Sequence, residues 1–395
     1  MNQWLAIGIF MLLTVEANAS QKLSGSARVS GSTAKTTSYS RAVSTYQYGQ
    51  SLTIRPGIEF APTSYMHTPL ADDVAIDSNS AVYVSTLIAQ RANNFGVANV
   101  NVREFTPSIY IVSSTQPTVQ VRMWDRTNPT ENYFQPLQDK WQEVPLPSTF
   151  TVAGGTDQEM VVYQPETGTM WEFWKMKITT STVFNSTGGL VYQYGARWGG
   201  RMDDIARNPG YFQTENAGDW STLTGYKFGT TATSLPFLAG IITIEEQQAG
   251  VINHAIGLAV VDAALFTRWQ YPANRSDGTV KKDGAIAEGM MFRFPYDLDL
   301  STFGMKPYGL MIARAVQKYG MFVWDKAGSV SFRAENPGNK YEGEDPYTKD
   351  GGISGCVDGI PNDDCYLDDH TYGNGGQLEN FPWANLQVIQ GQWNQ

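Results

Sequence analysis

The chain has 395 residues, of which 42% are hydrophobic, 12% aromatic and 17% charged, and its formal net charge is −10. This much apolar material excludes intrinsic disorder over most of the length and is enough for a large buried core. The negative charge excludes the basic surface that nucleic acids require and, more weakly, disfavours binding to anionic membranes.

The N-terminus has the features of an export signal. Leu5 to Val15 is an apolar run shorter than the ~20 residues that span a bilayer, and Ala17-Asn18-Ala19 is a small-x-small cleavage site. Because the usual basic residues before such a run are missing, a buried N-terminal strand is the alternative. We expect residues 1–19 to be a signal peptide and the protein to be secreted or periplasmic, with no transmembrane segment.

Residues 20–45 are rich in Ser and Thr, which predicts a flexible lead-in. No comparable break follows, so residues 46–395 are expected to form one domain. Three short helices are predicted within it, because each has a start or stop signal next to an apolar stripe. They follow Asp77-Ser78, follow the Thr243–Glu246 capping box up to Gly250, and span Leu310 to Tyr319 before Gly320.

The remaining pattern alternates short strands with turns. Two hairpins are predicted, one joining 160–163 to 170–176 and the other joining 321–324 to 330–333. Further strands are expected at 190–198 and 251–261. Many strands with few helices predict a mainly β fold, a two-sheet β-sandwich or jelly roll with about three short helices.

Cys356 and Cys365 lie in an acidic C-terminal region, from Tyr341 to His370. In an oxidising compartment they should form a disulfide, and closing so short a loop contributes roughly 2–3 kcal/mol. Two free thiols are the alternative. The acidic residues of this region could bind a structural Ca²⁺, and a simple solvated loop is the alternative. We expect no other metal and no cofactor.

Common catalytic motifs are absent from the sequence. It contains no HExxH, GxSxG, P-loop, GxGxxG or CxxC pattern. This excludes the common zinc proteases, α/β-hydrolases, P-loop enzymes and dinucleotide-binding enzymes.

Aromatic residues next to carboxylates are the main remaining signal. The strand period places Glu172 and Trp174 on one face. An unpaired carboxylate is costly in a core, so this face predicts a wet, aromatic-lined groove, in which indole rings pack against sugar rings. Each of these aromatics has core packing as its alternative.

The same period aligns Tyr194 and Trp198, and the glycines that follow place Arg201 and Asp203 at the end of that strand. An ordinary turn with a surface ion pair is the alternative. His254, in an apolar strand, is either a hydrogen-bonded core histidine or a general acid/base.

A loop that begins at Trp269 combines aromatic and charged residues. Arg275 and Asp277 lie within it and Glu288 follows, so these three are expected to form one polar cluster. A structural ion network explains the cluster equally well.

Several phrases together resemble a group of secreted, largely uncharacterised bacterial proteins, many of them from actinobacteria. The resemblance covers roughly residues 65–335 and implies export and a shared fold, without an activity. The chain is also similar in composition to jelly-roll polysaccharide lyases and hydrolases, although it lacks the E-x-D-x-E strand motif of one such group. The phrases are Trp171-Glu172-Phe173-Trp174, Trp198-Gly199-Gly200, Leu235-Pro236 with Gly240-Ile241-Ile242, Ile252-Asn253-His254-Ala255, Tyr271-Pro272-Ala273 with Asp277-Gly278, and Gln317-Lys318-Tyr319-Gly320.

The leading hypothesis is a secreted protein that cleaves a polysaccharide or oligosaccharide with two carboxylates, as glycoside hydrolases do. Its catalytic candidates are Glu172, His254 and Asp277, and its substrate-binding candidates are Trp174, Tyr194, Trp198, Arg201, Trp269, Arg275 and Glu288. A polysaccharide lyase, with a His or Tyr base and an arginine that neutralises a uronate, is one alternative. A non-catalytic glycan-binding, envelope or structural protein is the other. The negative charge favours a neutral glycan.

Overall fold

A computed structural model describes residues 60–123, 134–178, 193–212, 228–340, 346–347 and 377–393. All of them belong to one compact unit, Gly49–Gln395. The predicted signal peptide, the lead-in, the Cys356–Cys365 disulfide, His370 and nearly all of the acidic region with its Ca²⁺ site lie outside the described residues.

Helices α1 (Ser80–Asn93), α3 (Ile244–Ala249) and α4 (Pro307–Tyr319) correspond to the three predicted helices. The start and stop of α3 are those expected, since Thr243 and Glu246 form a capping box and Gly250 ends the helix at φ 68°. Helix α2 (Gln135–Lys140) was not predicted. Among the described residues, no helix is both long and apolar enough to cross a membrane.

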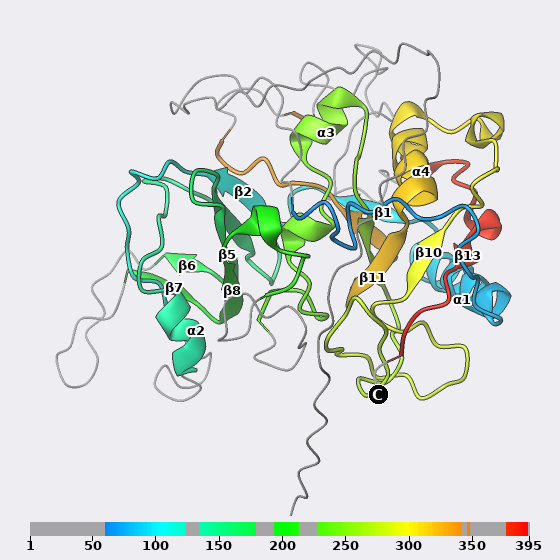
Figure 1. Cartoon of the computed structure of the whole chain (residues 1–395), viewed down its shortest axis with the longest axis horizontal. Helices are drawn as coiled ribbons and strands as arrows, with labels where there is room; N and C mark the ends of the chain where they lie inside the picture. Colours follow the sequence, from blue (N-terminus) through cyan, green and yellow to red (C-terminus); the bar gives the residue numbers. More distant parts are fainter. Residues whose placement is uncertain are drawn as a thin grey trace, which may run out of the picture. The chain divides into compact units, whose positions relative to one another are not determined.

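The largest sheet has six strands in the order β1-β12-β9-β11-β10-β13. These strands are β1 (Asn99–Asn101), β12 (Ser331–Arg333), β9 (Ile256–Val260), β11 (Met321–Lys326), β10 (Met291–Arg293) and β13 (Gln387–Val388). Helices α1 and α4 lie beside this sheet, with α1 against β13 and α4 against β10 (Figure 1).

Two smaller sheets have the orders β2-β4-β5-β8 and β3-β7-β6. Their strands are β2 (Ser108–Ile111), β4 (Met160–Gln164), β5 (Thr169–Trp174), β8 (Trp198–Met202), β3 (Arg122–Met123), β7 (Tyr194–Ala196) and β6 (Lys177–Ile178). The fold is therefore mainly β with few helices. Four strand pairs are parallel, and the described strands form three sheets, so a two-sheet jelly roll is not confirmed.

One predicted hairpin is confirmed and the other is wrong. Strands β4 and β5 pair antiparallel, with Val161 opposite Glu172. Strands β11 and β12 do not pair, because β9 lies between them and pairs parallel with β11 and antiparallel with β12. The predicted turn at 325–328 is also wrong, because Asp325 and Lys326 belong to β11 and Gly328 is not among the glycines with positive φ. An apolar strand from a distant part of the chain takes the central position.

Strand β11 contributes to two hydrophobic cores. Met321 and Val323 belong to the core that α1, α4 and the six-stranded sheet enclose. Phe322 and Trp324 belong to the core that includes the four-stranded sheet. Because successive side chains of a strand point to opposite faces, this one strand joins both cores.

Gly257 of β9 allows Trp324 to lie against the sheet. A Cβ atom at this position would be 2.3 Å from the Trp324 ring, closer than atoms can approach. The glycine is therefore required by the close approach of an indole to the strand.

We expect Gly257→Ala to lower the free energy of unfolding by about 1–3 kcal/mol, because the added methyl group overpacks the site. Gly328→Ala is the matched control, since a Cβ atom there meets nothing within 4 Å. Urea unfolding of both variants measures the difference. Equal stability of the two variants would contradict the packing of Trp324 on Gly257.

Candidate functional site

The prediction that Glu172 lies on a solvent-exposed strand face is wrong. Its side chain is 0% exposed, and every residue of β5 except Trp174 is buried. The Oε1 atom accepts hydrogen bonds from the Thr230 main-chain N at 2.7 Å and from Thr230 Oγ1 at 3.0 Å, and Oε2 accepts one from the Phe237 main-chain N at 3.0 Å. The carboxylate thus holds the segment 228–237 against β5.

Burial raises the pKa of Glu172 to about 7, although the hydrogen bonds from Thr230 and Phe237 oppose the shift. Its three partners all donate, so the site accommodates a carboxylate better than a carboxylic acid or an amide. The geometry therefore supports a structural role for Glu172 and offers no contact with an external substrate.

Arg275 binds the same segment from its carbonyl side. Its Nε donates to the Ala232 carbonyl at 3.0 Å, and its Nη2 donates to the carbonyls of Gly229 and Thr231 at 3.0 and 2.7 Å. One carboxylate and one guanidinium therefore fix this loop through main-chain atoms.

The structure brings Arg275, Asp277 and Glu288 together. The Glu288 Oε2 atom accepts a hydrogen bond from the Asp277 main-chain N at 3.0 Å, and all three residues interact electrostatically. Glu288 is fully buried, and burial raises its pKa to about 8. The Asp277 side chain is 57% exposed and lies 3.6 Å from Lys326 Nζ.

Sequence reasoning missed the ion network that continues from this cluster. Arg333 donates to Glu159 Oε1 at 3.1 Å and to Asp325 Oδ2 at 2.9 Å. Burial raises the pKa of Glu159 to about 8 and that of Asp325 to about 6, although Arg333 opposes both shifts. The network joins the four-stranded sheet, through Glu159, to strands β11 and β12. The sequence signal for this network was a pair of charged residues, Asp325 and Arg333, in the predicted hairpin 321–333.

His254 lies in a separate buried pair. Its Nδ1 is 2.8 Å from the Ala255 carbonyl oxygen, and its Nε2 is 3.1 Å from Glu246 Oε1. The Ala255 carbonyl and an ionised Glu246 both accept, so a protonated imidazole, which donates from both nitrogens, satisfies both contacts. Burial by itself lowers the pKa of His254, but Glu246 outweighs it and raises the pKa above its ordinary value. A general base must be neutral, so this geometry does not favour His254 as the base of a lyase.

The predicted aromatic platform is divided between two sheets. Tyr194 lies in β7 and Trp198 in β8, so they do not share a strand face. Trp174 donates from Nε1 to Asp157 Oδ1 at 3.0 Å, and its ring centroid is 4.8 Å from Lys175 Nζ and 5.5 Å from Arg197 Cζ. The protein's own charged groups therefore engage this indole.

Two other candidates, Arg201 and Trp269, have local roles. Arg201 donates to Asp203 at 2.9 Å and lies over the Trp171 ring, which fits the alternative of a surface ion pair. Trp269 is half-buried and precedes Gln270, whose main-chain N donates to the Glu288 carbonyl at 2.8 Å. None of these contacts forms a groove.

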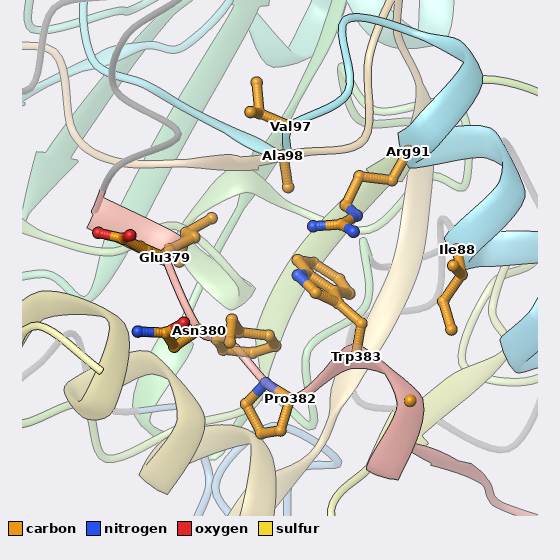
Figure 2. Close-up of a pocket in the computed structure, with 11 residues that line it drawn as sticks. Ile88, Arg91, Val97, Ala98, Glu379, Asn380, Pro382 and Trp383 are labelled. Atoms are coloured by element: carbon orange, nitrogen blue, oxygen red, sulfur yellow. The ribbon is translucent and has the colours of Figure 1, made fainter. Parts of the chain in front are cut away.

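A pocket of about 590 Å³ lies elsewhere, between the C-terminal part of α1, the chain just before β1 and the segment before β13 (Figure 2). The sequence analysis singled out none of its residues, because they come from separate stretches of the chain and none of these stretches contains a recognisable motif. The lining consists of Ile88, Arg91, Val97, Ala98, Leu378, Glu379, Asn380, Phe381, Pro382, Trp383 and Ala384.

Two buried donors of this pocket lack partners. The Arg91 Nε and the Trp383 Nε1 make no hydrogen bond. Trp383 is 4% exposed, and the Arg91 guanidinium lies over its ring at 5.7 Å from the centroid. Figure 2 shows the Arg91 guanidinium and the Trp383 indole next to each other in the lining of the pocket.

Within the described residues, no three or more His, Cys, Asp or Glu side chains are grouped so that they could hold a metal ion. Comparisons of the chain with protein-family models, with curated proteins and with solved structures found no match. The resemblance to secreted bacterial proteins therefore stays a prediction.

We expect Glu172→Gln to lower the free energy of unfolding by about 1–3 kcal/mol, because the amide group places a donor against a donor from segment 228–237. Glu166→Gln, in the exposed turn between β4 and β5, is the matched control and should have no effect. Denaturant unfolding at pH 8 measures both. Unchanged stability of Glu172→Gln would contradict the structural role.

We expect His254→Gln to lower the free energy of unfolding by about 3–5 kcal/mol, because it leaves the buried Glu246 charge unpaired. Since the pKa of His254 is raised in the folded state, its contribution is complete below pH 6.5 and declines as the pH rises towards the folded pKa. The loss should therefore be larger at pH 6 than at pH 9.

The double variant His254→Gln/Glu246→Gln is the control, because it removes both charges. It should be more stable than the sum of the single losses predicts. Additive losses, or a loss independent of pH, would show that the two side chains do not form a charged pair.

Proposed function

We propose that the protein is an exported carbohydrate-binding protein and that its binding site is the Arg91–Trp383 pocket. The observation that carries the proposal is the pocket itself, in which the charged Arg91 and the indole of Trp383 lie together among apolar side chains. A sugar has hydroxyl oxygens that a guanidinium can bind and C–H groups that pack on an indole.

The composition of the lining supports the same proposal. Ile88, Val97 and Pro382 provide apolar surface on which the C–H groups of a sugar ring can pack, next to the polar Asn380. The volume of about 590 Å³ lies within the range of small-ligand sites. Export, predicted from the N-terminus, would place this site among extracellular or periplasmic glycans.

Binding without turnover is favoured over cleavage, because the first catalytic candidates have other tasks. Glu172 holds segment 228–237, and His254 forms an ion pair with Glu246. Neither side chain is open to a polymer.

Cleavage is the second candidate, and one observation favours it. Asp277 is exposed and interacts with Asp325, whose pKa burial raises to about 6. Two carboxylates with different environments are what acid and base catalysis require. In this hypothesis Asp325 supplies the proton and Asp277 is the nucleophile or base.

We expect the purified protein to bind members of a mono- and oligosaccharide panel without releasing reducing ends or unsaturated products. Trp383→Phe replaces the indole beside the Arg91 guanidinium with a smaller ring, and should weaken binding by about fivefold or more. Trp174→Phe is the matched control and should bind as the wild type does. Isothermal titration calorimetry measures affinity, and a reducing-end assay measures turnover.

Absence of binding across the panel would contradict the proposal. Release of reducing ends that disappears in Asp277→Asn would establish cleavage instead. Loss of binding in Trp174→Phe, with Trp383→Phe unaffected, would place the site at β5 and not at the pocket.

A further inference from the structure

We infer that the ligand of the Arg91–Trp383 pocket carries a carboxylate, which makes it a sugar acid, and that Arg91 binds this carboxylate. The inference rests on the proposed function and adds the class of ligand. It also revises the expectation of a neutral glycan that followed from the net charge alone.

Among the described residues, no carboxylate forms an ion pair with Arg91. Glu379 lines the same pocket, but Figure 2 shows its carboxylate turned away from Arg91. A cation in a partly enclosed site without a counter-ion favours an anionic ligand.

The Arg91 guanidinium lies next to a well-packed ring. Its Cζ is 5.7 Å from the Trp383 centroid, and that ring packs against Phe332 at 6.2 Å and Phe381 at 4.7 Å between centroids. A planar guanidinium with free N–H groups matches the two oxygens of a carboxylate better than it matches a single hydroxyl group. The pocket therefore distinguishes a uronic acid from the corresponding neutral hexose.

The ring of Trp383 fits the same ligand. The indole lies beside the guanidinium in the lining of the pocket, so its ring provides apolar surface next to the charge for the ring of a sugar acid. A net charge of −10 opposes a long polyanion, which points to a free acid or a single terminal residue of a glycan.

The test compares glucuronate with glucose by isothermal titration calorimetry on the full-length protein at low ionic strength. We expect glucuronate to bind about tenfold or more tightly than glucose, as a charged hydrogen bond implies. Arg91→Gln should remove this preference, so that glucuronate binds no more tightly than glucose. Arg207→Gln is the matched control, because that arginine is 84% exposed and not part of the pocket. Circular dichroism establishes that each variant is folded.

The wild type provides a second measurement that needs no substitution. Raising the salt concentration should weaken binding of glucuronate and leave that of glucose unchanged, because salt screens charge interactions. Cyclohexanecarboxylate, which has a ring and a carboxylate but no hydroxyl groups, should bind more weakly than glucuronate and still depend on Arg91.

The outcomes separate the two proposals. Equal affinity of the wild type for glucose and glucuronate would overturn the inference while the carbohydrate-binding proposal stands. If cyclohexanecarboxylate bound as tightly as glucuronate, the claim that the ligand carries a carboxylate would stand, but the claim that it is a sugar would be overturned. Binding of none of the three would overturn both.

Discussion

The alternation of side chains along β11 is the constraint on which the rest of the structure depends. Met321 and Val323 enter one hydrophobic core, and Phe322 and Trp324 enter the other. This arrangement requires a neighbouring strand with little bulk on the Trp324 side, and β9 meets the requirement at Gly257. Burial of apolar surface on both faces of one strand makes the two cores a single cooperative unit.

Buried charged groups lie near strand β11 and segment 228–237. Arg333 stacks near Trp324 and joins Glu159 to Asp325, while Glu172 and Arg275 fix segment 228–237. Buried ions of this kind are tolerated only when they are paired and hydrogen-bonded. In the sequence, aromatic residues next to carboxylates first indicated a sugar-binding groove. In the structure, most of these residues instead belong to the buried ion pairs and hydrogen bonds just described.

The pocket is formed in a different way. Its Arg91 comes from a helix, Val97 and Ala98 from the chain that follows, and Trp383 from a segment almost 300 residues later. It arises where these segments meet beside the six-stranded sheet, and its chemistry comes from one guanidinium that lies over one indole.

The sequence by itself determined features that depend on neighbours along the chain. The Thr243–Glu246 capping box, the stop at Gly250 and the β4–β5 hairpin followed from local hydrogen bonding and turn geometry. The proximity of Arg275, Asp277 and Glu288 also followed, because they lie close together in sequence. Only the tertiary structure decided that β9 separates β11 from β12, that Glu172 is sealed, and that Arg91 meets Trp383. These outcomes depend on which distant segments bury their apolar surface together, and no local pattern in the sequence encodes that choice.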